Sequence, residues 1–135
     1  MFFVLLVVFA AILGALMTAV HETNLTPAQA NAEQKERTEE ADKIAAYEEA
    51  KSECLRNLKA PSTADFSTYN WSPNTGAKKL TDNTWLSAGY VDAQNSFGAK
   101  IRENWTAVVR RDGDRWTVLY LKIGDKEEGD RSTLP

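Results

Sequence analysis

Residues 101–109, Ile-Arg-Glu-Asn-Trp-Thr-Ala-Val-Val, decide the fold, because apolar and polar side chains alternate along most of this segment. A two-residue period predicts a β-strand with one buried and one exposed face. The predicted buried face carries Ile101, Trp105, Ala107 and Val109, and the opposite face carries Arg102, Asn104, Thr106 and Val108.

Two neighbouring segments predict strands that pair with this one. Residues 84–93 place Trp85, Gly89 and Val91 on one side, and residues 115–123 are apolar on both faces. The connections are short: a tight turn before the strand, in which Gly98 supplies a positive φ, and an Asp-Gly turn after it. Strands joined by such short turns must pair antiparallel.

The rest of the C-terminal half gives weaker signals. A short strand is expected at residues 64–69, followed by a loop at 70–82 that contains a Ser-Pro-Asn-Thr-Gly turn sequence. Residues 124–135 are charged and contain glycine, and they predict a flexible tail. The expected sheet is therefore a meander of three to four antiparallel strands.

A long helix is predicted before the sheet. Thr26 is a suitable N-cap, Pro27 suits the first helical position, and Pro61 ends the element. Residues 31–43 are almost entirely polar and predict a partly helical stalk. The apolar residues then recur at helical spacing and predict a face that packs on the sheet: Ile44, Tyr47, Cys54, Leu55 and Leu58. The predicted fold class is α+β.

The N-terminus has the composition of a membrane segment. Residues 1–20 carry no charged side chain, and a helix of this length spans the hydrocarbon core of a bilayer. We expect a single transmembrane anchor that contacts the lipid bilayer through residues 2–20. The alternative is a signal peptide, because residues 28–32 contain two small-x-small cleavage patterns.

Four regions follow from these patterns: an anchor or signal segment at residues 1–21, a polar stalk at 22–43, an α+β globular domain at 44–123 and the tail. We expect a single-pass membrane protein whose globular domain is extracytoplasmic, or secreted if residues 1–30 are cleaved. A strict count of basic residues would instead leave the domain in the cytoplasm.

Composition argues against several classes of function. The net charge of −3 gives no general nucleic-acid footprint. The only histidine, His21, lies at the membrane edge, so the globular domain cannot form a Ser-His-acid or Cys-His pair. We expect a protein that is not an enzyme and that uses no cofactor or metal. The only cysteine, Cys54, predicts a small buried hydrophobe; a reactive thiol or a homodimer through an intermolecular disulfide is the alternative.

Two segments carry a resemblance to a known family. Residues 58–66 read Leu-Lys-Ala-Pro-Ser-Thr-Ala-Asp-Phe, and residues 89–102 read Gly-Tyr-Val-Asp-Ala-Gln-Asn-Ser-Phe-Gly-Ala-Lys-Ile-Arg. They resemble a family of small, membrane-anchored or exported bacterial and phage or prophage proteins. The resemblance implies a second cysteine near Trp105 in some members, which this chain lacks. It supplies no reaction and no catalytic residues.

The second segment also contains the candidate binding residues. A polar turn with flanking basic side chains predicts a loop tip that is presented to a protein partner, and an aromatic residue in the loop at 70–82 is a further candidate. The candidates are Trp71, Asp92, Gln94, Asn95, Ser96, Phe97, Lys100 and Arg102. The alternative is structural: Asp and Asn cap the turn, and Phe97 folds back over the hydrophobic face.

Two hypotheses for function follow. In the first, the chain is a membrane-tethered, non-enzymatic binding module for an envelope protein, and the phage resemblance implies modulation of the host envelope. In the second, it is a structural accessory subunit of a membrane complex.

Overall fold

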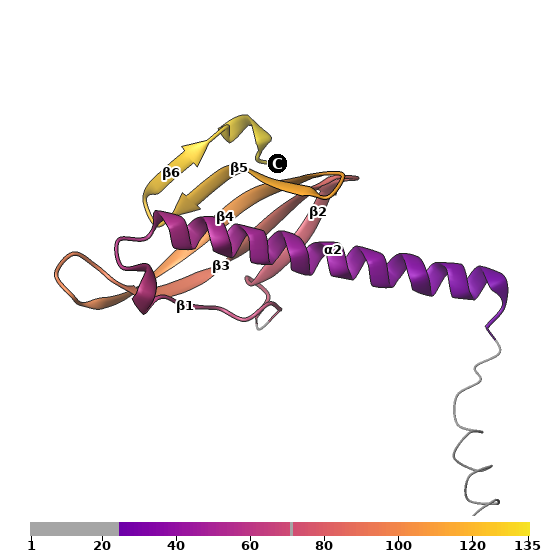
Figure 1. The fold of residues 1–135 in the computed structure, drawn as a ribbon, viewed down its shortest axis with the longest axis horizontal. Coiled ribbons are helices and arrows are strands. Elements are labelled where there is room, and N and C mark those ends of the chain that lie inside the picture. Colours follow the sequence, from indigo (N-terminus) through magenta and orange to yellow (C-terminus); the bar gives the residue numbers. More distant parts are fainter. Residues whose placement is uncertain (1–24, 71) are drawn as a thin grey trace, which may run out of the picture. The chain divides into compact units, whose positions relative to one another are not determined.

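A computed structural model describes residues 25–70 and 72–135. It confirms the α+β class: one long helix, α2 (Pro27–Asn57), accompanies an antiparallel sheet (Figure 1). By its internal contacts the chain divides into two units, residues 1–35 and 36–135, and α2 contributes residues to both. None of the helices in the described ranges is long and apolar enough to cross a membrane. The predicted span, residues 2–20, lies outside the described residues.

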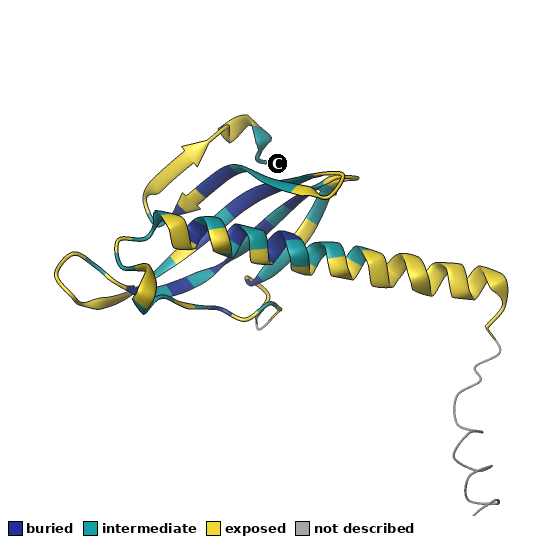
Figure 2. Cartoon of the chain, in the orientation of Figure 1, coloured by how far each residue is buried: buried dark blue, intermediate teal, exposed yellow. Residues whose placement is uncertain are grey.

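The predicted start of the helix is confirmed. The Thr26 hydroxyl accepts a hydrogen bond from the Gln29 backbone N–H at 3.3 Å, and the Gln29 side chain accepts one from the Thr26 N–H at 2.8 Å. This reciprocal pair is a capping box. The polar residues 31–43 continue the helix without a break, and the residues from Pro27 to Thr38 are exposed (Figure 2).

The buried side of α2 differs in part from the predicted face. Tyr47 and Cys54 are buried as expected, but Ile44 and Leu55 remain 43% and 39% exposed. Ala46 and Ala50 take their place in the core. A pattern of large apolar residues cannot locate a contact made by alanines, whose small side chains let the helix lie close to the sheet.

The sheet has six strands, two or three more than expected. They are β1 (Asp65–Phe66), β2 (Gly76–Thr81), β3 (Thr84–Gln94), β4 (Lys100–Asp112), β5 (Arg115–Ile123) and β6 (Lys126–Gly129). The order is β1-β3-β4-β5-β6, and β2 also pairs with β3. Two short 3₁₀ segments, η1 (Pro61–Thr63) and η2 (Arg131–Thr133), complete the described elements.

The additional strands lie in segments predicted to be irregular. β2 occupies part of the predicted loop at 70–82, and β6 occupies part of the predicted tail at 124–135. Neither strand has an alternating apolar pattern. Each is held by the longer strand beside it, β2 by β3 and β6 by β5, so tertiary pairing overrides weak local propensity.

The core lies between α2 and one face of the sheet (Figure 2). Trp85 and Val91 of β3 and Trp105 and Val109 of β4 face the helix, as the alternation predicts. In β5, the pairing with β4 passes from Tyr120 to Val118 and skips Leu119. This bulge lets residues on both sides of Leu119 reach the core.

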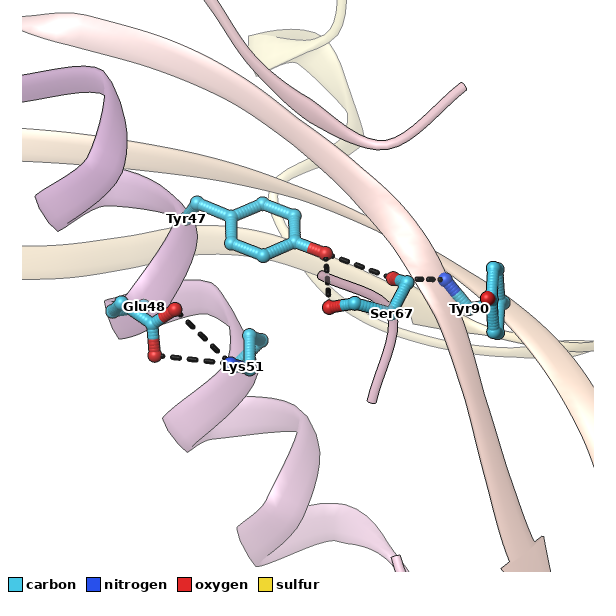
Figure 3. Close-up of polar contacts among 5 residues, drawn as sticks. All are labelled: Tyr47, Glu48, Lys51, Ser67 and Tyr90. Carbon is cyan, nitrogen blue, oxygen red and sulfur yellow. Dashed lines mark hydrogen bonds and ion pairs between the residues drawn. The ribbon is translucent and has the colours of Figure 1, made fainter. Parts of the chain in front are cut away.

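A buried hydrogen-bond network joins the helix to the sheet. The Tyr47 hydroxyl lies 2.8 Å from both the carbonyl oxygen and the hydroxyl of Ser67, and the Ser67 hydroxyl accepts a bond from the Tyr90 backbone N–H (Figure 3). A Cβ atom added at Gly89 would lie 2.5 Å from the Ser67 hydroxyl and 2.7 Å from the Trp105 ring. Gly89 is therefore required by the close approach of these groups.

Candidate functional site

The most promising site is a cleft beyond the C-terminal end of α2. The helix ends at Asn57, whereas the β3–β4 hairpin continues past it (Figure 1). The apolar face of the sheet is therefore left without helical cover at this end. Ile101, which the sequence places on the buried face, is 41% exposed for this reason.

The cleft has an apolar floor and a charged rim, with a volume of about 240 Å³. The floor residues come from the position just after the helix and from three strands: Leu58, Ala93, Ile101, Leu121 and Ile123. Around them lie two basic and two acidic side chains, Lys59, Lys126, Glu103 and Glu128, together with Asn57, Gln94, Asn95 and Ser96. The charges balance, so the cleft does not select a ligand by net charge.

The hairpin turn that forms one wall is held by its own hydrogen bonds. The Asn95 side-chain oxygen accepts bonds from the backbone N–H groups of Phe97 and Ala99 at 2.9 and 3.1 Å. The Gly98 N–H donates to the Asn95 carbonyl at 3.0 Å, and Gly98 has a φ of 79°. The predicted positive φ is thus confirmed, and Asn95 has the expected capping role.

Two further contacts attach the hairpin to the segment after the helix. Lys59 Nζ donates to the Ser96 hydroxyl at 2.8 Å, and the Gln94 backbone N–H donates to the Thr63 hydroxyl at 3.0 Å. Lys59 and Thr63 belong to the first motif, and Gln94 and Ser96 belong to the second. The structure therefore brings the two motif segments together as one wall of the cleft.

Phe97 lies at the tip of this hairpin and is 93% exposed. The expectation that it folds back over the hydrophobic face is wrong, because the turn bonds of Asn95 hold the tip beyond the sheet. Exposed apolar residues are ordinary at surfaces, but an almost fully exposed phenyl ring on a hydrogen-bonded turn is a candidate contact residue.

Asp92 and Arg102 lie elsewhere, on the face of the sheet that points away from α2. Arg102 donates two hydrogen bonds to the Asp92 carboxylate, at 2.7 and 2.6 Å, and its guanidinium lies 3.9 Å from the centre of the Tyr90 ring. The hydrogen bonds from Arg102 hold the pKa of the Asp92 carboxyl below its ordinary value. Both charges are satisfied within the sheet, so this pair stabilises the hairpin and adds nothing to the cleft.

The eight sequence candidates are thus divided among several places. Gln94, Asn95 and Ser96 line the cleft. Lys100 is exposed and lies 3.9 Å from Asp65 in an ion pair. Trp71 lies outside the described residues.

Sequence reasoning missed most of the cleft. Pro61 predicts where the helix ends, but no local pattern shows that Asn57 and Leu58 then face the ends of β4 and β5. Lys126 and Glu128 lie in β6, within the predicted tail. A cleft whose residues come from five separate segments has no sequence signal of its own.

Neither an accessible thiol nor a metal-binding cluster is found among the described residues. Burial raises the pKa of the Cys54 thiol to about 12, and its side chain is completely buried. The thiol is therefore protonated and inaccessible in the folded chain, as expected for a small core residue. Among residues 25–70 and 72–135, no group of His, Cys, Asp and Glu side chains is placed to hold a metal ion.

No protein family, curated protein or solved structure matches this chain. The resemblance to the bacterial and phage family therefore rests on the two motif segments alone.

Proposed function

We propose that this chain is a membrane-tethered, non-enzymatic binding module that contacts an envelope protein through the Phe97 hairpin and the adjoining cleft. One observation carries the proposal: a phenyl ring that is 93% exposed stands on a hydrogen-bonded turn beside a cleft with an apolar floor. Aromatic anchors and small apolar pockets are the features that dominate protein–protein binding energies.

The size of the cleft favours a protein side chain over a small-molecule substrate. Ligand pockets commonly occupy about 300–1,000 Å³, and the cleft is smaller, at about 240 Å³. An apolar cavity of about 150 Å³ holds a benzene ring. One aromatic or large aliphatic side chain therefore fits, with its backbone lying along the charged rim.

The membrane part of the proposal comes from the sequence. The uncharged residues 1–20 fit a bilayer anchor, and a polar helix with a well-formed N-cap follows them. Tethering confines a binding module to a surface and raises its effective concentration, so even a small contact surface becomes useful.

The test is photocross-linking in the native membrane, with a photoreactive residue at Lys100, beside the hairpin tip. We expect a specific cross-linked protein whose yield falls at least about tenfold in Phe97→Ala, because burial of one phenyl ring contributes about 1.5–3 kcal/mol. Ile44→Ala is the matched control, since Ile44 is a half-exposed aliphatic residue outside the cleft lining. A cross-linking pattern unchanged by Phe97→Ala contradicts the proposal.

A further inference from the structure

We propose that the cleft accepts Phe97 of a second copy of this chain, so that two copies form a symmetric dimer. This inference rests on the proposed function and names the partner of the same site. Its basis is the juxtaposition of an exposed phenyl ring and a cleft of matching chemistry on one hairpin.

The exposed ring and part of the cleft floor lie on the same hairpin. Ala93 and Ile101, opposite each other at the base of the hairpin, form part of the cleft floor, and Phe97 lies four residues from each. A strand rises about 3.3 Å per residue, and part of this path is turn, so tip and floor are at most about 13 Å apart. If two hairpins lie antiparallel about a two-fold axis, each tip meets the base of the other. One rotation then fills both clefts, as an isologous interface requires.

A phenyl ring fits the cleft by volume. The cleft has a volume of about 240 Å³, and an apolar cavity of about 150 Å³ is already large enough for a benzene ring. Phe97 does not line the cleft of its own chain, and the turn bonds of Asn95 keep it exposed. The ring is therefore available to a second copy without rearrangement of the turn.

The charges at the tip and around the cleft are compatible with a contact between two copies. The turn residues 95–99 carry no charge themselves, and the Lys59 ammonium that donates to Ser96 accompanies the tip toward the acidic rim of the other cleft. Two lysines and two glutamates surround the cleft, so two identical surfaces meet without net repulsion. In the proposed dimer, the lysines of one rim, Lys59 and Lys126, face the glutamates of the other rim, Glu103 and Glu128.

The expected dimer is reversible. A phenyl ring buries about 150–250 Å² of surface. The total area buried by two rings and the two cleft rims is therefore expected to be below about 1,200 Å², which is typical of weak and transient interfaces. Confinement to a membrane surface compensates for such a small area by raising the local concentration.

The experiment uses the full chain in phospholipid vesicles, with Phe97→p-benzoylphenylalanine in light chains mixed with isotopically heavy chains that retain Phe97. After irradiation we expect a light–heavy dimer whose adduct maps to the cleft residues of the heavy chain, within 57–59, 93–103 or 121–128. Ile101→Asp in the heavy chain should lower the dimer yield at least about tenfold, and Ile44→Asp should not. Far-UV circular dichroism checks that both variants fold.

Each other outcome overturns the inference in a distinct way. A light–heavy dimer that maps elsewhere, or that persists in Ile101→Asp, shows that Phe97 does not use this cleft. The absence of a dimer in vesicles, with a Phe97-dependent cross-link to a different protein in native membranes, overturns self-association and leaves the proposed function intact. The absence of any Phe97-dependent cross-link in either setting overturns both.

Discussion

Ser67 and Ser87 are both buried, at 2% and 0% exposure, but their hydroxyls are in different situations. Ser67 accepts a hydrogen bond from the Tyr90 N–H and contacts the Tyr47 hydroxyl (Figure 3). The Ser87 hydroxyl has no hydrogen-bond partner among the described residues. A buried polar group stabilises a fold only when it is paired.

This difference predicts opposite results for the same substitution. Ser67→Ala should lower the free energy of unfolding by about 1–3 kcal/mol, because it leaves the part-buried N–H of Tyr90 without this acceptor and removes a buried contact of the Tyr47 hydroxyl. Ser87→Ala should leave the free energy of unfolding unchanged or raise it, since no bond is lost. Urea denaturation of the two variants measures both values. A larger loss in Ser87→Ala than in Ser67→Ala would contradict this account of the core.

The Asp92–Arg102 pair predicts a pH effect. Hydrogen bonds from Arg102 lower the pKa of Asp92 in the folded chain, with a smaller contribution from the charge of Lys100. A carboxyl with a lowered folded pKa stabilises the fold above its unfolded pKa of about 3.9, and this contribution is lost as the pH falls through the folded pKa.

An NMR titration of the Asp92 carboxyl tests this. We expect a pKa below about 3.9 in the native chain and a return toward that value in Arg102→Gln. Lys100→Gln is the control and should raise the pKa less, because Lys100 acts only through its charge. Equal shifts in the two variants would argue against the hydrogen bonds as the main cause.

At the scale of elements, the β3–β4 turn depends on one positive φ and one side-chain oxygen. Gly98 has a φ of 79°, and a Cβ atom added there would meet nothing within 4 Å. Gly98→Val should therefore lower the free energy of unfolding by about 1–2 kcal/mol through backbone strain alone. Gly98→Asn should cost clearly less, because Asn adopts left-handed angles more readily. Thermal unfolding of both variants measures which one is less stable. Equal losses of stability would contradict an origin in the positive φ of residue 98.

The elements with a strong period were predictable from sequence. The alternation of Trp105, Ala107 and Val109 identifies β4, and Thr26 with Pro27 identifies the start of α2; both predictions are confirmed. β2 and β6 could not be predicted, because Lys78 and Lys79 in one and the run 126–129 in the other show no apolar alternation. Each strand forms because it pairs with the longer neighbouring strand, β3 or β5, and not because of a pattern in its own residues.

The same limit applies to the candidate site. The turn chemistry of residues 95–98 was predictable, because Asn and Gly have local reasons to occupy a turn. The exposure of Phe97 was not, since a phenyl ring near a sheet is expected to pack on it. The contact between Lys59 and Ser96 joins positions 37 residues apart, and no spacing rule predicts such a bond.

At the scale of the molecule, the C-terminal segment belongs to the fold. β6 pairs with β5 over four residues, the Tyr120 hydroxyl donates to Glu127 at 3.0 Å, and the Asp130 N–H donates to the Leu119 carbonyl at 2.9 Å. The segment also supplies Lys126 and Glu128 to the cleft. A flexible tail would make none of these contacts.

Truncation tests whether the C-terminal segment is part of the fold or a flexible tail. Removal of residues 125–135 should lower the free energy of unfolding by about 2–4 kcal/mol, because several β5–β6 hydrogen bonds are lost together. Removal of residues 131–135 keeps β6 and the Asp130 contact and should cost less. Chemical denaturation of the two truncated chains gives the comparison. If the longer truncation is as stable as the full chain, β6 does not contribute to stability.

The two edges of the sheet determine whether crowded copies of the chain can pair strand to strand. At one edge, all four residues of β6 are exposed, and three of them are the charged residues Lys126, Glu127 and Glu128. The other edge is divided between β1, with two residues, and β2, with six. Strands that are short or charged are poor templates for edge-to-edge pairing between molecules. The sheet is therefore protected against amyloid-like stacking, even where many copies share a small area.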